Sequence, residues 1–386
     1  MKKIIIALSF LLFSAYANAD CNIKSGSINI LANDFPAFRT LVETARECTG
    51  KAELKVTHSA EHNKIAVPAL TANPSKFSVR VVASSSIVPL MNGGLIRPMN
   101  DLVEKYGKGI QESQLITIDG KVMAVAFMAN AQHLYIRTDV LKQHSISTPK
   151  TYEEVVAAAE KIRDAGKMKY PYAAAYKAGW NLAEEFVNMY IGHGGEFFIA
   201  GSAKPSINNA QGVATLNMLK KLADLSNPDF LTHDSESIKV EWEAGNVAIM
   251  TLWASRAGTL LDAEGDAKIT AATKLVAPAT VGGGNIPATT LWWDGFTLAK
   301  NRSDADADAS FRAMAHAASS KEMVATAADQ AVWLIEGFVP GPKSVGVIKA
   351  VEMGAKPYPM LPQMGLMRSE ERRVGKECRS RWSPYH

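Results

Sequence analysis

The sequence predicts an α/β protein made of two lobes. From residue 27 onward, short apolar runs rich in β-branched residues alternate with amphipathic helical stretches, a pattern typical of parallel sheets covered by helices. The stretch from residue 20 to residue 367, about 348 residues, is longer than one hydrophobic core usually needs, so we expect a second core. No low-complexity linker and no short-period repeat interrupts this stretch.

The first lobe begins with strands and helices in alternation. Ser27–Ala32 is expected to be a strand, and Pro36 opens an amphipathic helix, since proline loses no hydrogen bond in the first helical turn. This helix should reach Cys48 and bury Phe38, Leu41, Val42 and Ala45. The elements expected next are strands at Leu54–Thr57 and Phe77–Ala83, helices at Asn63–Leu70 and Ile87–Asn92, and an extended connection at Leu95–Leu102.

A second series of elements starts after a strand that ends at Tyr135–Ile136. Thr151 and Glu154 have the spacing of a capping box, so we expect a helix to begin there and to end before Gly166. The elements that follow are a strand near Tyr172–Ala175, a helix at Asn181–Tyr190, a helix from Asn208 that buries Val213, Leu216 and Leu219, strands within Glu243–Trp253 and Leu291–Lys300, and a helix capped by Ser303.

The first 19 residues have the composition of a cleaved signal peptide. Lys2 and Lys3 precede a ten-residue apolar run, too short to cross a bilayer, and Ala17-Asn18-Ala19 is a cleavage signal. Asp20 stands where lipid attachment at Cys21 would need a small residue. We therefore expect an exported, periplasmic protein.

The last segment, residues 368–386, differs in character from the rest. It is strongly charged, has no apolar periodicity, and one back-translation of it resembles a sequencing adapter, so we interpret it as a non-native tail and expect the native chain to be truncated after Met367. The tail carries a net charge of +3 and the signal peptide +2, so the formal charge of +4 becomes −1 for residues 20–367. This removes any compositional argument for nucleic-acid binding.

Two cysteines, Cys21 and Cys48, remain once the tail is set aside. An even number of cysteines in an exported chain predicts a disulfide, with two free thiols as the alternative. The sequence lacks the G-x-S-x-G, H-E-x-x-H, P-loop and G-x-G-x-x-G motifs. We therefore expect no enzyme activity, no cofactor and no metal, and we interpret the one His-containing glycine-rich segment, at residues 193–196, as a turn.

Four segments resemble the family 1 extracellular solute-binding proteins of ABC importers. They are LYIRTDVLKQHSISTPKTYEEVVAAAEKIRDAG at 134–166, EAGNVAIMTLW at 243–253, LWWDGFTLAK at 291–300 and GFVPGPKSV at 337–345. The resemblance extends from residue 27 to residue 367 and implies a type II periplasmic binding protein fold with hinged lobes and several crossings. Lobe 1 would comprise residues 20–133 and 297–340, and lobe 2 residues 134–296 and 341–367.

The same resemblance implies a function. Such a protein would be a monomer that binds a small-molecule carbohydrate between its lobes and delivers it to an inner-membrane ABC permease. Ligands of open α/β sheets lie beyond the carboxyl ends of strands. The candidate ligand-binding residues at predicted strand ends are Asn33, Asp34, Ser85, Ser86, Asn130, Trp180, Trp253, Arg256, Trp293 and Asp294.

These residue types suit a sugar or polyol, because Asp, Asn and Arg bind hydroxyls and a flat indole stacks on a C–H face. Several alternatives remain open at this stage. Asp34 could cap the helix at Pro36, the serines at 84–86 could cap the helix at Ile87, and Arg256 could be a surface charge. Trp292 and Trp293 should point to opposite faces of an extended strand, and we favour Trp293 as the ligand contact.

The ligand class also has rivals. A sugar phosphate would need several cations at the site, and a polyamine would need several carboxylates with aromatic clamps. From a different class, an exported carbohydrate-active enzyme would need a pair of carboxyl groups at hydrolase spacing, and the sequence offers no obvious pair.

Overall fold

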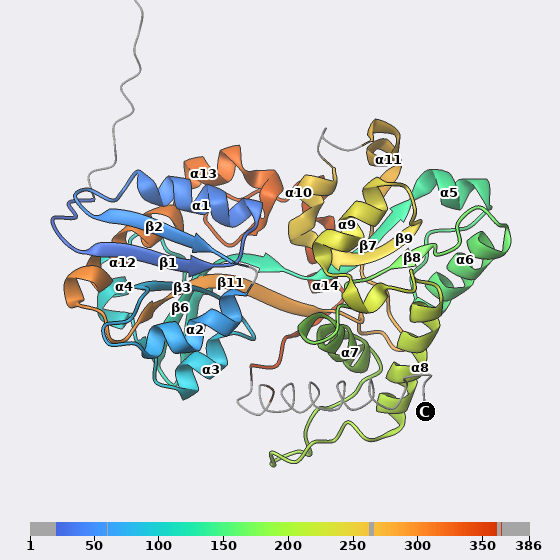
Figure 1. Cartoon of the computed structure of the whole chain (residues 1–386), viewed down its shortest axis with the longest axis horizontal. Coiled ribbons are helices and arrows are strands. Elements are labelled where there is room, and N and C mark those ends of the chain that lie inside the picture. The colour runs from blue at the N-terminus through green and yellow to red at the C-terminus, as the bar shows by residue number, and fades with distance from the viewer. Residues whose placement is uncertain (1–20, 60, 262–265, 361–363, 365–386) are drawn as a thin grey trace, which may run out of the picture.

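The computed structural model describes residues 21–59, 61–261, 266–360 and 364, which form two lobes, each around its own sheet (Figure 1). The predicted signal peptide (1–19) and the predicted non-native tail (368–386) lie outside the described residues. None of the helices in the described part of the chain combines the length and the apolar character that crossing a bilayer requires.

The sheet of lobe 1 combines strands from both ends of the chain. Its strands are β1 (Ser27–Ala32), β2 (Glu53–His58), β3 (Val79–Ala83), β4 (Ile96–Arg97), β5 (Leu115–Ile118), β6 (Lys121–Asn130), β11 (Thr290–Ala299) and β12 (Val332–Trp333). A short strand, β13 (Lys356–Pro357), joins this sheet at the crossing by pairing with the first two residues of β11. The order across the sheet is β12-β6-β11-β3-β1-β2. β1 pairs in parallel with β2 and β3, which confirms the predicted parallel arrangement, whereas β11 runs antiparallel between β3 and β6.

Helices cover both faces of this sheet. They are α1 (Pro36–Arg46), α2 (His62–Thr71), α3 (Ile87–Asn92), α4 (Asn100–Tyr106), α12 (Asp304–Ala317) and α13 (Lys321–Thr326), with the short 3-10 turns η1 (Glu112–Gln114) and η4 (Ala328–Gln330). α1, α4, α12 and α13 share one core with the sheet, centred on Phe38, Phe127, Phe296 and Phe311. α2 and α3 pack on the opposite face around Leu31.

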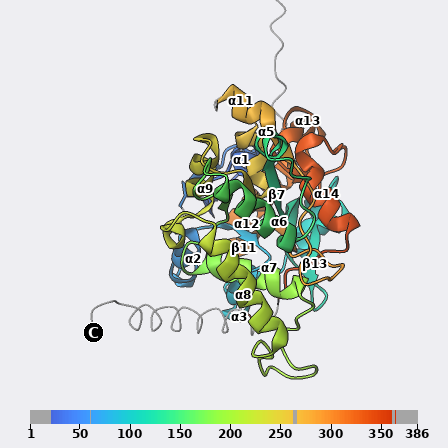
Figure 2. The same ribbon diagram turned by 90° about the vertical axis from the view of Figure 1, so that its right-hand side faces the viewer.

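Lobe 2 has a smaller sheet with the order β10-β7-β9-β8. Its strands are β7 (Gln132–Arg137), β8 (Tyr172–Ala173), β9 (Ile249–Trp253) and β10 (Thr273–Leu275). Its helical elements are α5 (Thr138–Gln143), α6 (Tyr152–Asp164), α7 (Trp180–Gly192), α8 (Ala210–Asp224), η2 (Phe230–Thr232), α9 (Ser235–Glu243), η3 (Ala254–Arg256), α10 (Ala257–Leu260), α11 (Ala267–Ala272), η5 (Pro342–Ser344) and α14 (Val345–Glu352). Figure 2 views this lobe end-on.

Three crossings connect the lobes within the described part of the chain. β6 continues into β7 with Ala131 between them, β11 passes from lobe 2 into the sheet of lobe 1, and the chain returns from β12 to α14, which packs on Ala131 (Figure 1). Strand pairing sets the first two crossings at Ala131 and just before Trp292, because Gln132 already pairs with Trp253 and Trp292 already pairs with β6. The boundaries expected from the sequence are 133/134 and 296/297.

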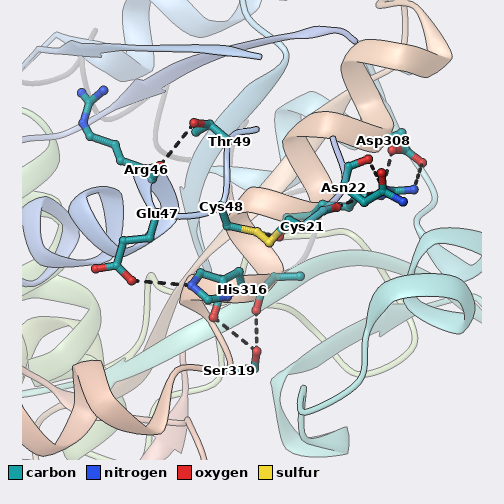
Figure 3. Close-up of a disulfide and its surroundings, with 11 residues drawn as sticks. Cys21, Asn22, Arg46, Glu47, Cys48, Thr49, Asp308, His316 and Ser319 are labelled. Carbon is teal, nitrogen blue, oxygen red and sulfur yellow. Dashed lines mark hydrogen bonds and ion pairs between the residues drawn. A yellow bond between two sulfur atoms is a disulfide. The ribbon is translucent and has the colours of Figure 1, made fainter. Parts of the chain in front are cut away.

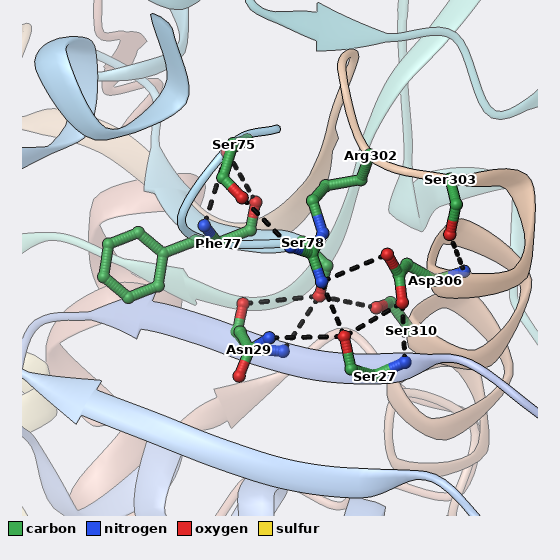
Figure 4. A network of polar contacts seen from close by, with 9 residues as sticks. All are labelled: Ser27, Asn29, Ser75, Phe77, Ser78, Arg302, Ser303, Asp306 and Ser310. Carbon is green, nitrogen blue, oxygen red and sulfur yellow. Dashed lines mark hydrogen bonds and ion pairs between the residues drawn. The ribbon is translucent and has the colours of Figure 1, made fainter. Parts of the chain in front are cut away.

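A half-buried polar network holds the start of β1 against α12, although these segments are far apart in the sequence (Figure 4). The Ser27 N–H and hydroxyl both donate to Asp306 Oδ1, at 2.7 and 2.9 Å. Ser310 Oγ donates to Ser78 Oγ at 2.8 Å, and the Asn29 N–H donates to the same Ser78 oxygen at 2.9 Å. Lobe 1 is therefore completed by residues beyond 300.

Most local expectations are confirmed, and two are wrong. The Thr151–Glu154 capping box is present in both directions at the start of α6, and Ser303 caps α12. Asn100–Tyr106 forms α4, whereas we expected an extended connection, because Leu102 finds a buried place against the sheet.

The start and the inward face of α8 also differ from the prediction. The cap is Asn209, whose side chain accepts from the Gly212 N–H. Val213 and Leu216 are more than half exposed, and only Leu219 of the three predicted apolar residues is buried. Since buried Thr215 and Gly212 lie on the inward face, apolar spacing alone selected the wrong stripe.

Cys21 and Cys48 are joined by a disulfide, with their Cα atoms 5.3 Å apart (Figure 3). The bond ties the segment before β1 to the residue that follows the C-terminal end of α1. Cys48 is fully buried, and Arg312 on α12 donates to the Cys21 carbonyl at 3.1 Å.

Candidate ligand-binding site

The topology brings the predicted strand ends of both lobes to adjoining edges. β1 and β3 are parallel, and β11 is antiparallel to both β3 and β6, so β1, β3 and β6 all end at one edge of the lobe 1 sheet. In lobe 2, β8 and β9 are parallel and end where Trp253 pairs with Gln132. Since Gln132 follows the end of β6 by two residues, the two edges meet at the crossing strands.

Three tryptophans from separate segments form an aromatic cluster on the lobe 2 edge. The Trp180 ring at the start of α7 stacks on Trp253 at a centroid distance of 6.1 Å and meets Trp292 edge-on at 5.8 Å. Trp253 and Trp292 are 5.5 Å apart, and Tyr358 lies 4.2 Å from Trp292. Trp180 is 38% exposed while Trp253 and Trp292 are buried, so Trp180 forms the accessible surface of the cluster.

A buried hydrogen-bond network connects the Trp292 indole of this cluster to Thr290 and to polar residues of α7. Trp292 Nε1 donates to Thr290 Oγ1 at 2.7 Å, and the Thr290 hydroxyl is 3.0 Å from Glu184 Oε1 and 2.7 Å from Asn188 Oδ1. Asn188 Nδ2 continues the network to Gln132 Oε1 at 3.3 Å. The network fixes the orientation of the Trp292 indole relative to α7, the helix that carries Trp180.

Trp292 and Trp293 point to different lobes, as expected for neighbours on an extended strand. Trp293 is half-buried and packs against the lobe 1 cluster around Leu31 and Ile87, and its N–H donates to Ser84 Oγ at 3.2 Å. The sequence analysis favoured Trp293 as the ligand contact. The structure instead brings Trp292 to Trp180 and Trp253.

Asp294 lies at the polar edge of lobe 1. It pairs with Ala83 across the sheet, next to the irregularity between Asp294 and Gly295. Its carboxylate has no hydrogen bond or ion pair within the described part of the chain, and desolvation by burial raises the pKa of Asp294 to about 7. A recessed carboxyl group with unused acceptors can bind a hydroxyl-bearing ligand.

Of the two predicted serines after β3, Ser86 forms a hydrogen bond within the turn and Ser85 does not. Ser86 Oγ accepts from the Ala83 N–H at 2.9 Å, so it closes the turn, and it makes no side-chain cap to α3. The proposed capping of α3 by a serine side chain is therefore wrong for Ser86. Ser85 is half-buried, and its hydroxyl has no partner among the described residues.

Asp34 forms an ion pair with Arg39 and lies close to His58, both in lobe 1. Arg39 donates to both carboxylate oxygens at 2.6 Å, and His58 is 3.6 Å away. The residue that caps α1 is Phe35, with no side-chain cap, so the alternative of Asp34 as the cap is wrong. Asn33 Oδ1 accepts from the Asp34 N–H at 2.9 Å and shapes this corner.

Arg256 and Asn130 are also held by neighbours. Arg256 pairs with Glu236 and has only 17% of its side chain exposed, which argues against a free surface charge. Asn130 Nδ2 donates to Ser255 Oγ at 3.1 Å and thereby links the end of β6 to η3. The pKa of Asp34 is lowered chiefly by its hydrogen bond to Arg39, and the charge of Arg256 adds to that effect. A cation of lobe 2 therefore acts on a carboxylate of lobe 1 across the two edges.

The sequence analysis missed the supporting residues of the site. Glu184, Glu185 and Asn188 are buried on α7, and Thr290 is buried at the start of β11. Burial raises the pKa of Glu185 to about 8. The sequence does contain a pattern that could have indicated these residues. Polar residues stand one turn apart on a helix that begins with a tryptophan, and buried polar groups need partners.

Two hollows on the described residues lie away from the predicted ligand-binding residues. One of about 550 Å³ lies at the end of lobe 1 away from the crossings, beside Arg97, Lys121 and Lys300, and another of about 420 Å³ lies beside Lys24 and Asp308. Neither contains a predicted ligand-binding residue.

Comparisons with solved structures show the same two-lobe fold. A maltose-bound protein of T. maritima aligns with a TM-score of 0.80 over 93% of this chain and 96% of that chain, at 16% identity. A solute-binding protein of Agrobacterium radiobacter K84 in complex with ribitol aligns with a TM-score of 0.76 over 91% and 92%, also at 16% identity.

At the level of sequence, the chain is 29% identical over 143 residues to a probable ABC transporter-binding protein of Deinococcus radiodurans. The matched segment covers 36% of this chain and 34% of that relative, so it spans about a third of the relative's length. A family model for bacterial extracellular solute-binding proteins matches residues 41–355. Because this match extends over well more than half of the sequence, the chain belongs to the bacterial extracellular solute-binding protein family.

Proposed function

We propose that this protein is the substrate-binding component of an ABC importer and that it captures a neutral carbohydrate, which is a sugar, an oligosaccharide or a polyol, between its two lobes. The observation that carries the proposal is the pairing of an aromatic edge with a polar edge. Trp180 presents an indole on a supported cluster, and Asp294 presents an unpartnered carboxyl group on the neighbouring edge.

The two edges match the two kinds of surface on a sugar. The C–H face of a pyranose or an extended polyol packs on an indole ring, while its hydroxyls donate to carboxylate and serine oxygens. We assign the stacking to Trp180, Trp253 and Trp292, and the hydroxyl contacts to Asp294, Ser85 and Asn33. The maltose and ribitol complexes of the structural neighbours support this ligand class.

Capture would proceed by hinge closure about the three crossings. A ligand that contacts both edges binds the closed state more tightly than the open state, and this difference in affinity shifts the equilibrium toward closure. The closed, monomeric protein would then dock on an inner-membrane permease from the periplasmic side. The extracellular character of the family and the predicted leader support this location.

The charges at the site disfavour the two rival ligand classes. A phosphate would need free cations, but Arg39 and Arg256 are already paired with Asp34 and Glu236. A polyamine would need several free carboxylates at the site, and we assign a single carboxylate, Asp294, to ligand contact. The family is one of solute-binding proteins, so the alternative of a carbohydrate-active enzyme is set aside.

A thermal-shift screen tests the proposal. The protein is heated with maltose, mannitol, ribitol, a hexose phosphate or spermidine, and a bound ligand raises the melting temperature by mass action. We expect a shift with at least one neutral carbohydrate and a smaller one for Trp180→Ala. A shift with spermidine or the hexose phosphate alone would overturn the carbohydrate assignment.

A further inference from the structure

We propose that reduction of the Cys21–Cys48 disulfide converts it, together with His316, into a zinc site. The geometry points to this site because the two sulfur atoms and one imidazole nitrogen of His316 all lie within 4.8 Å of one another (Figure 3). Two thiolates and an imidazole are a preferred donor set for Zn²⁺, and three protein donors leave the fourth position for water. The site lies in lobe 1 and is independent of the proposed ligand-binding edges.

The distances suit a tetrahedral ion. With Zn–S bonds of about 2.3 Å and Zn–N bonds of about 2.0 Å, neighbouring donor atoms lie about 3.5–3.8 Å apart. The nitrogen is already within 4.8 Å of both sulfurs, so small adjustments complete the triangle. The Cα atoms of the two cysteines are 5.3 Å apart, which leaves room for the sulfurs to separate without backbone rearrangement.

Two of the three donors are fixed by the core. Cys48 follows α1 and is fully buried, and His316 lies in the last turn of α12. α1 and α12 pack against each other in the main core of lobe 1 through Phe38 and Phe311. Cys21 lies on the segment before β1, so it is the donor that adjusts.

His316 has an unused donor atom and a nearby carboxylate. Its Nε2 atom is buried without a hydrogen-bond partner in the described structure, and Glu47 Oε2 lies 3.8 Å from that atom, beyond hydrogen-bond length. We assign the zinc contact to Nδ1, because a carboxylate that accepts the N–H of the other ring nitrogen, here Nε2, orients a metal-bound imidazole and raises its basicity. The zinc charge would be balanced by the two thiolates.

The chemistry balances with a named reductant. A phosphine takes the oxygen of one water and becomes a phosphine oxide, while the disulfide gains two electrons and two protons to give two thiols. Zinc then binds both sulfurs and the neutral imidazole and releases the two thiol protons. Re-oxidation by a disulfide-bearing oxidant would expel the ion.

Cobalt substitution tests the site directly. The protein carrying Cys378→Ser, which removes the third thiol of the chain, is reduced with a phosphine, desalted without oxygen and titrated with Co²⁺ and then with Zn²⁺. We expect thiolate-to-cobalt absorption that saturates at one equivalent per chain and is abolished by one equivalent of Zn²⁺. The oxidised protein is the matched control and should show no such band.

Variants separate this site from non-specific thiol binding. Glu47→Gln should weaken the affinity of the reduced protein for Zn²⁺ by roughly tenfold. His316→Ala should weaken it further, because it removes one of the three donor atoms. Circular dichroism of each reduced variant verifies that it is folded. Absence of the cobalt band in folded reduced protein, or an unchanged affinity in His316→Ala, would overturn the proposal. Neither result depends on carbohydrate binding.

Discussion

The two edges that meet at the crossings are built in opposite ways. The lobe 2 edge is an aromatic cluster whose members support one another and rest on a buried hydrogen-bond network. The lobe 1 edge consists of short polar side chains. Some bind neighbours in the same lobe, such as Asp34, and some have no partner among the described residues, such as Asp294. One edge therefore has a fixed shape, whereas the other has unused hydrogen-bonding capacity.

This contrast predicts that substitutions on the two edges will have different consequences. On the aromatic edge, we expect substitution of buried members to reduce stability and substitution of exposed members to reduce ligand binding. On the polar edge, side chains add little to stability, and their effect appears in binding and in its pH dependence. The following substitutions test that division, from the largest expected effect to the smallest.

Trp292→Ala should have the largest effect on stability. Trp292 is buried between Trp253 and Tyr358 and donates to Thr290, so truncation leaves a cavity and removes one hydrogen bond from the buried network. We expect the free energy of unfolding to fall by about 3–5 kcal/mol, measured by urea denaturation. A loss no larger than that of Trp180→Ala would show that the cluster is not part of the core.

Trp180→Ala should instead reduce binding. Trp180 is 38% exposed and contacts two rings of the cluster, so we expect a loss of stability of about 1–2 kcal/mol, smaller than for Trp292→Ala. Affinity for the carbohydrate found in the thermal-shift screen should fall by about tenfold, because one stacking face is lost. Isothermal titration calorimetry of the wild type and of Trp180→Phe, which keeps a ring, provides the comparison. Unchanged affinity would exclude Trp180 as the stacking surface.

Asp294→Asn should change the pH dependence of the protein. Burial raises the Asp294 pKa from 3.8 to about 7, so the folded state holds this proton more tightly than the unfolded state. Its contribution to stability is complete below about pH 4 and declines as the pH rises toward 7 and beyond. Ligand hydroxyls favour the ionised carboxylate, so affinity should rise between about pH 6 and pH 8 with release of a proton.

Both dependences should disappear in Asp294→Asn, whose amide does not titrate. Unfolding curves at a series of pH values measure the pH dependence of stability. Calorimetry in buffers of different ionisation enthalpy measures the release of a proton on ligand binding. An affinity of the wild type that stays constant over this pH range would contradict the assignment of Asp294 to the site.

Arg39→Ala should have the smallest effect. The ion pair with Asp34 is exposed, and such pairs contribute little to stability because water screens them. The melting temperature should stay nearly unchanged, while the Asp34 pKa returns toward its ordinary value, as seen by NMR titration. A large drop in melting temperature would show that this corner supports the lobe.

The sequence predicted much of the architecture, and the ligand contacts that it suggests remain predictions. Alternating apolar runs identified β1, α1, α3 and α6 with few boundary errors, because local periodicity and caps determine such elements. The antiparallel insertion of β11 between β3 and β6 depends on contacts between residues more than 150 positions apart, which no local pattern encodes.

For the candidate site, residue type and strand position predicted Trp180, Trp253 and Asp294 as ligand contacts, and the structure places Trp180 and Trp253 in one aromatic cluster. Residue type and strand position could not decide between Trp292 and Trp293. Neighbouring side chains on a strand point to opposite faces, but the sequence does not tell which face lies toward Trp180. The supporting residues Thr290 and Glu184 were missed because their importance lies in a hydrogen-bond network that forms only in three dimensions.

The position of β11 also has a consequence for the order in which the chain can fold. Among the described strands, β11 is what joins β3 to β6, so the lobe 1 sheet stays in two pieces until residues near 299 have been synthesised. The lobe 2 sheet lies entirely within residues 132–275 and can form earlier. The first strands to be made must therefore wait for a late partner, which reverses the usual sequence of N-terminal domain first.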